Sequence, residues 1–152
     1  SLAPQSVAGY EALGALYDRM EEYEAAIQTY SKLLGLDSTN HKAYFNRAYD
    51  YDLIAKTEKA IADYSQAIRY NEKYGDAYFN RGYIYSDLNE FDKAIADYDK
   101  VIELEPDSPD AYFNRGIAKI NAGRKHDGCS DINKAASLGD KTAKKYCSAN
   151  CK

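Results

Sequence analysis

The sequence is short of most residues that carry out chemistry. It contains no Trp, one Met and two His, and its three Cys all lie at or after position 129. Neither His stands in a recognisable motif with a Ser or Cys nucleophile, and no Gly-rich loop that could hold a phosphate is present. We therefore expect no enzymatic activity and no cofactor.

Long apolar runs and clusters of basic residues are also missing. No apolar run approaches the roughly 18 residues that span a bilayer, so we expect a soluble chain without membrane insertion. The 20 Lys and Arg residues are dispersed among 24 Asp and Glu residues, and the net charge is −4. Because phosphate binding needs concentrated positive charge, nucleic acid is not an expected partner.

A repeated phrase dominates what is present. The phrase AYFNR occurs three times at intervals of 34 residues, with a weaker copy 34 residues earlier, and KAIADY occurs twice with the same offset. A fixed period of this length is typical of stacked supersecondary units within one domain. The predicted domain is 1–152, with repeats at residues 7–40, 41–74, 75–108 and 109–138.

Aromatic and small residues recur at fixed positions of the 34-residue unit. With each unit numbered from its first residue, Tyr predominates at positions 4, 11 and 24, and Gly or Ala occupies positions 8 and 20. Spacings of three and four residues are helical, so each unit is predicted to be a pair of helices and the protein all-α. Ten of the 16 Tyr lie at these three positions, which makes the Tyr content mainly a matter of packing.

This pattern resembles the tetratricopeptide repeat family, from Val7 to about Leu138. The third unit matches the family pattern everywhere, including Pro106 at position 32, apart from Val101 at position 27. The resemblance implies a right-handed α-solenoid of four helix-turn-helix repeats that acts as a non-catalytic protein–protein interaction module or scaffold. A capping helix at about residues 140–147 is expected to cover the last repeat.

Charged residues at two positions of the unit change together. Position 7 is Arg wherever position 23 is Asp, whereas the first unit has Leu13 and Thr29 instead. We expect ion pairs that join the two helices of a repeat. These structural pairs are Arg47–Asp63, Arg81–Asp97 and Arg115–Asp131.

The resemblance also implies that the first helix of each repeat lines a concave groove. Aromatic rings there would accept apolar side chains, and Asn amides would bond to a peptide backbone. The predicted peptide-binding residues are Phe45, Asn46, Tyr49, Phe79, Asn80, Tyr83, Phe113, Asn114 and Ile117. Because acidic residues flank them, the expected ligand is apolar or aromatic with some positive charge. Alternatively, the Phe rings only pack against the neighbouring helix and the Asn side chains only make local contacts.

Some family members hold the C-terminal carboxylate of chaperone peptides with a clamp of Lys, Asn and Arg side chains. Glu11 and Asp76 stand at two of the matching positions, where they would repel a carboxylate. We do not expect that function. A second alternative is a structural role, in which end repeats or convex faces associate with other copies of the chain.

The cysteines lie in the last repeat and the predicted cap. We expect a Cys129–Cys147 disulfide that fixes the capping helix, with Cys151 left over, which would indicate an oxidising compartment. The alternatives are a zinc-type site made by His126 and the three Cys, or free thiols.

Overall fold

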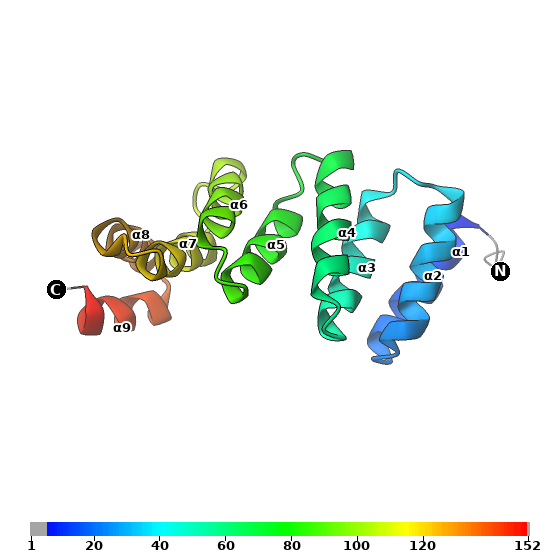
Figure 1. Cartoon of the computed structure of the whole chain (residues 1–152), viewed down its shortest axis with the longest axis horizontal. Helices are drawn as coiled ribbons and strands as arrows, with labels where there is room; N and C mark the ends of the chain where they lie inside the picture. The colour runs from blue at the N-terminus through cyan, green and yellow to red at the C-terminus, as the bar shows by residue number, and fades with distance from the viewer. Residues whose placement is uncertain (1–5, 152) are drawn as a thin grey trace. The chain divides into compact units, whose positions relative to one another are not determined.

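The structure is a computed structural model that describes residues 6–151, so residues 1–5 and 152 of the predicted domain lie outside it. The described residues form nine α-helices and no strand (Figure 1), which confirms the all-α class. None of these helices combines the length and the apolar character needed to cross a membrane. The helices are α1 (Val7–Arg19), α2 (Tyr23–Leu36), α3 (His41–Leu53), α4 (Thr57–Tyr70), α5 (Gly75–Asp87), α6 (Phe91–Leu104), α7 (Pro109–Asn121), α8 (Lys125–Ser137) and α9 (Lys141–Asn150).

The helices fall into two compact units. The first unit ends at Ala77 and the second begins at Tyr78, within α5. Helices α1 to α4 belong to the first unit, and α6 to α9 to the second. The interpretation of residues 1–152 as one domain stays a prediction.

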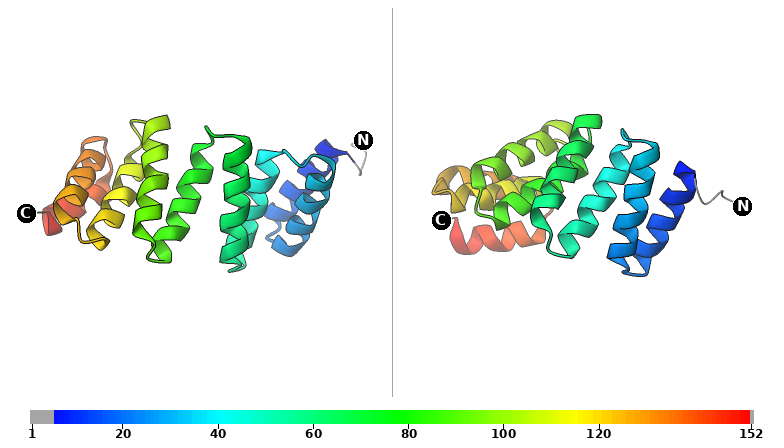
Figure 2. Two further views of the ribbon diagram at one scale, coloured as in Figure 1. Left: turned by 45° about the horizontal axis from the view of Figure 1, so that its top comes forward. Right: turned by 45° about the vertical axis from the view of Figure 1, so that its right-hand side comes forward.

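In the first unit, each helix packs against the next one along the chain (Figure 2). Its core contains Ala26, Tyr30 and Leu33 of α2, all at most 1% exposed. Gly14 of α1 lies against the ring of Tyr30, and a Cβ at that glycine would come within 2.6 Å of two ring atoms. The small residue at position 8 therefore makes room for the aromatic ring at position 24.

In the second unit, the backbones of α7 and α8 approach each other closely. A Cβ at Gly116 of α7 would lie 2.8 Å from the carbonyl oxygen of Gly128 on α8, so these two backbones meet without side chains between them. Beyond them, α9 runs beside α8 (Figure 2). Asp140 caps α9 by accepting hydrogen bonds from the amides of Thr142 and Ala143. The observed capping helix ends at Asn150, three residues beyond the predicted end.

The turn between the two helices of a repeat contains a residue in the left-handed region. These residues are Glu21 (φ 59°), Ala55 (φ 56°), Asn89 (φ 60°) and Gly123 (φ 82°), all at position 15 of their units. Side chains with a Cβ adopt this conformation at a cost of about 1 kcal/mol. The geometry of the helix pair therefore overrides the local preference of residues such as Ala55.

Candidate functional site

The Arg residues at position 7 lie between the two helices of their repeats. Arg47 donates from Nε to Asp63 Oδ2 (2.6 Å) and from Nη2 to Oδ1 (2.9 Å), and the carboxylate of Asp63 is largely buried. The same two-pronged pairing joins Arg81 to Asp97 and Arg115 to Asp131. Such a pair fixes the geometry of two helices more than it adds stability. These arginines therefore have a structural role.

The three Phe at position 5 lie half-buried on the first helices. The Phe45 ring centroid is 5.6 Å from that of Tyr64 and 4.9 Å from that of Tyr74, both in the first unit. In the second unit, Phe79 packs against Tyr98 and Phe113 against Tyr146, with centroid separations of 5.6 and 6.2 Å. Each Phe therefore contributes one side to the packing of its unit and leaves the other partly accessible.

The Tyr at position 9 are the most accessible rings among the predicted peptide-binding residues. Tyr49 on α3 and Tyr83 on α5 are each 50% exposed. Leu53, one turn after Tyr49 on the same helix, is 46% exposed and extends the apolar surface of the first unit. Ile117, at position 9 of the last repeat, is instead half-buried against Ile132 and its neighbours.

The Asn at position 6 already make hydrogen bonds within the chain. Asn46 donates from Nδ2 to the hydroxyl of Tyr30 (3.2 Å), and Asn114 donates to the carbonyl oxygen of Asp110 (2.8 Å). Asn80 is half-buried on α5. For Asn46 and Asn114, one amide N–H is therefore already used within the chain, which leaves the second N–H and the amide oxygen for a ligand.

A buried carboxyl pair in the first unit escaped the sequence analysis. Asp18 of α1 accepts a hydrogen bond from the hydroxyl of Tyr30 (2.6 Å), and Asp50 of α3 is 1% exposed. The signal in the sequence was position 10, which holds Leu16, Ile84 and Ala118 in the other units but Asp50 in the second.

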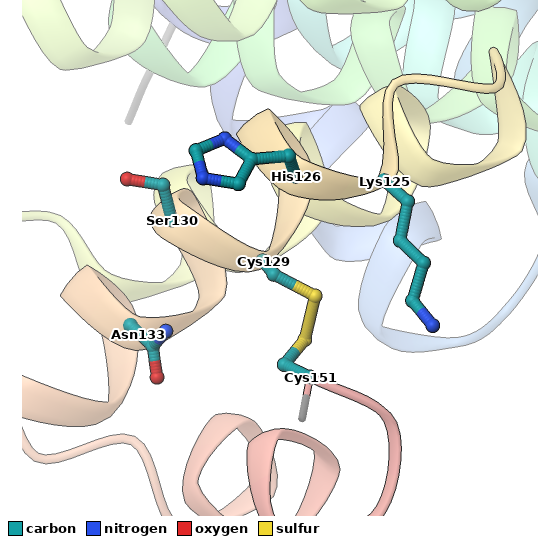
Figure 3. A pocket seen from close by; sticks show the side chains of 6 residues that line it. All are labelled: Lys125, His126, Cys129, Ser130, Asn133 and Cys151. Carbon is teal, nitrogen blue, oxygen red and sulfur yellow. A yellow bond between two sulfur atoms is a disulfide. The ribbon is translucent and has the colours of Figure 1, made fainter.

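The predicted Cys129–Cys147 disulfide is wrong. Cys129 is bonded to Cys151 (Figure 3), with a Cα–Cα distance of 5.5 Å. Cys147 is a free thiol. The reason is the extra length of α9, which brings Cys151, the residue after the helix, opposite Cys129. Cys147 lies one turn earlier and packs against the core formed by Ile132 and Ala143.

The disulfide also bears on the zinc-type alternative. Two of its four proposed ligands, Cys129 and Cys151, are bonded to each other, and His126 is exposed beside the disulfide (Figure 3). Within residues 6–151, no group of three or more His, Cys, Asp or Glu is placed to hold a metal ion.

Comparison with known proteins identifies the repeats. A family model described as TPR repeat matches residues 56–89 and 82–123, and one described as tetratricopeptide repeat matches residues 7–40. The chain belongs to the tetratricopeptide repeat family. A search of curated proteins found no match.

Solved structures of MamA resemble this tetratricopeptide repeat chain throughout. One crystal structure of MamA is 31% identical over 93% of this chain and 82% of its own, with a TM-score of 0.86. A second is 31% identical over 93% of this chain and 77% of its own, with a TM-score of 0.85. MamA from Desulfovibrio magneticus RS-1 shares the fold at 13% identity, with a TM-score of 0.84 over 91% of this chain and 78% of its own. The predicted α-solenoid class is thereby confirmed, and the family supports a role as a protein–protein interaction scaffold.

Proposed function

We propose that this tetratricopeptide repeat chain is a non-catalytic module that binds an extended peptide or a partner helix on its first helices. The observation that carries the proposal is the half-exposure of Tyr49 and Tyr83. These rings occupy the same repeat position, whereas the Tyr at position 24 of the first three repeats are fully buried. An aromatic ring left half in solvent at a recurring position is suited to contact a ligand.

The half-buried Phe supply the base of this surface. Phe45 is half-buried in the first unit, and Phe79 and Phe113 are half-buried at the same repeat position in the second. Their packing against core rings holds them in place, so that a ligand side chain would meet rigid aromatic surfaces. Asn46, Asn80 and Asn114 would contribute polar contacts to the ligand backbone.

The charge of the surface indicates the chemistry of the ligand. Exposed carboxylates lie on the first helices, at Asp52 of α3, at Asp76 and Asp87 of α5, and at Asp110 of α7. A Tyr ring next to carboxylates favours a cationic side chain, which gains from both the ring face and the opposite charge. We infer a ligand with apolar or aromatic residues and at least one Lys or Arg.

Selection from a random peptide library tests the proposal. The natural chain is compared with a Tyr49→Ala/Tyr83→Ala double variant, whose exposed side chains can be removed without opening the core. The matched control is Tyr70→Ala, which removes a Tyr of α4 that is 38% exposed. We expect a shared motif containing Lys or Arg to be enriched by the natural chain and the control only. Enrichment of the same peptides by the double variant would disprove the assignment.

Self-association is the second candidate function, and one observation favours it. Leu16 at position 10 of α1 is 42% exposed and Met20 is 56% exposed, whereas Ile84 at the same position as Leu16 is 3% exposed. An accessible apolar patch of this kind would pair with the same patch on a second copy. A solution mass that doubles with concentration, and does not with Leu16→Glu, would support this pairing. A solution mass that does not depend on concentration would contradict self-association.

A further inference from the structure

The first unit buries two carboxyl groups next to each other. Asp50 of α3 is 1% exposed. Asn46, one turn before it on the same helix, is linked to Asp18 of α1 through the Tyr30 hydroxyl, and Asp18 is the carboxyl group that acts on Asp50. In the other repeats the position of Asp50 is occupied by Leu16, Ile84 and Ala118, so an apolar contact between repeats is replaced here by an acid. Neither carboxyl group forms an ion pair with Lys or Arg in the part of the chain that the structure describes.

The hydrogen bonds around the pair leave one donor missing. Asn46 donates to the Tyr30 hydroxyl, which directs the hydroxyl hydrogen towards Asp18 Oδ2. The remaining oxygens, Asp18 Oδ1 and both Oδ of Asp50, are buried and have no hydrogen-bond partner. Ionised carboxylates only accept hydrogen bonds, so two of them facing each other cannot satisfy one another. A single proton on Asp50 supplies the missing donor to Asp18 and removes one of two buried negative charges.

We propose that Asp18 and Asp50 share one proton that joins α1 to α3, and that loss of this proton at alkaline pH loosens the packing of the first repeat on the second. The proposal does not depend on the peptide-binding function. Its consequence for that function is that Tyr49, which precedes Asp50 on α3, is held by a contact that depends on pH.

The groups around the pair favour retention of the proton. Burial, together with the neighbouring Asp18 carboxyl, raises the pKa of Asp50 to about 8. Glu21, in the turn after α1, is a further acidic residue close to Tyr23, which also lies near the pair. The pKa values of Tyr23 and Tyr30 of α2 are both raised, so these two groups are neutral near pH 7, and Tyr49 of α3 also lies close to the pair.

The sign of the pH dependence follows from the proton count. In the unfolded chain Asp50 ionises near pH 4, whereas in the folded chain it holds its proton to about pH 8. Between these values the folded state binds more protons than the unfolded state, so stability falls as the pH rises and becomes level above about pH 8. One proton changes the unfolding equilibrium constant by at most about tenfold per pH unit.

Two measurements on the full chain test the proposal. The carboxyl carbons of Asp are followed by NMR from pH 3 to 10, and urea unfolding is measured from pH 5 to 9. The variants are Asp50→Asn, whose amide can donate to Asp18 at any pH, and Asp50→Leu, which restores the residue type of the first repeat. Glu72→Gln, a change at an exposed position of the same unit, is the control.

We expect one Asp carboxyl carbon to titrate near pH 8 and to be absent from Asp50→Asn. The natural chain and Glu72→Gln should lose stability between pH 5 and 8. Asp50→Asn should lack this slope and exceed the natural chain in stability at pH 9. The proposal is wrong if every Asp carboxyl titrates below about pH 5 in the folded natural chain, a result that needs no variant to fold. It is also wrong if EDTA lowers the stability of the natural chain at pH 7 and calcium restores it, because the pair would then hold a metal cation instead of a proton.

Discussion

Substitution of Gly14 by Ala tests whether the alternation of small and aromatic residues holds the first repeat together. The added Cβ would lie 2.6 Å from Cε1 and Cζ of Tyr30, well inside contact distance. The Tyr30 ring is 1% exposed and its hydroxyl is bonded to Asp18 and Asn46, so it cannot move aside without breaking these contacts. Overpacking of this kind costs about 1–3 kcal/mol.

The higher intrinsic helix propensity of Ala would favour the substitution. Ala is better than Gly inside a helix by about 1 kcal/mol, which opposes the clash. Gly35→Ala in α2 isolates this gain, because a Cβ at Gly35 has no atom within 4 Å. We expect Gly35→Ala to stabilise the chain by about 0.5–1 kcal/mol, and Gly14→Ala to destabilise it by about 1–2 kcal/mol.

Urea unfolding followed by far-ultraviolet circular dichroism measures both changes in the free energy of unfolding. The difference between the two variants reports the clash, since the helix preference is common to them. If Gly14→Ala stabilises the chain as much as Gly35→Ala does, the close approach of α1 and α2 at Tyr30 is not a constraint. The interpretation of position 8 as a packing position would then be refuted.

Three further predictions concern the turn, the ion pairs and the disulfide. Ala55→Gly should raise the free energy of unfolding by about 0.5–1 kcal/mol, because glycine adopts the left-handed conformation without strain. Arg47→Met should lower it by about 2–3 kcal/mol, because the largely buried Asp63 carboxylate loses both of its guanidinium bonds. Cys129→Ser under oxidising conditions should lower it by about 3 kcal/mol, since the disulfide closes a loop with a sequence separation of 22 residues, whereas Cys147→Ser should leave the disulfide intact.

Each of these changes has a matched control. Ala62→Gly, at an exposed site inside α4, should lower the free energy of unfolding. If Ala62→Gly also raised it, the effect of Ala55→Gly could not be assigned to its turn. Arg69→Met removes an exposed Arg of α4, and an equal loss there would contradict the role given to Arg47. A reducing agent should lower the stability of the natural chain towards that of Cys129→Ser; if it has no effect, the disulfide does not stabilise the cap.

The repeat period was enough to predict the helices because the same side chains recur at the same positions of four units. The aromatic and small residues at positions 8 and 24 define which faces meet, and the structure places Gly14 against Tyr30 as this pattern requires. The departures from the period were harder to predict. The Cys pairing depended on how far α9 extends, because the helix ends at Asn150, three residues beyond the predicted end, and helix ends are poorly defined by sequence.

The predicted peptide-binding residues show a different limit of sequence reasoning. Helical periodicity places Phe45 and Tyr49 on one side of α3, but it does not reveal how much of each ring a neighbouring side chain covers. Phe45 turned out to be half-buried because Tyr74, in the turn before α5, lies against it. The Asn46 amide donates a hydrogen bond to the Tyr30 hydroxyl of the preceding repeat. Both contacts join residues that are distant in sequence, so the repeat pattern alone could not rank these side chains.

Within a repeat protein, the positions at which one unit differs from the others carry the most specific information. A residue that occurs in every unit is explained by the architecture, because each unit must pack on the next. Asp50 interrupts an otherwise apolar position, and the structure pairs it with Asp18 of the adjacent repeat without a counter-charge. Because this arrangement lowers stability as the pH rises towards the pKa of Asp50, the requirement that each unit packs on the next does not explain it. We therefore expect function in this chain to be concentrated where α1 meets α3, beside the accessible ring of Tyr49.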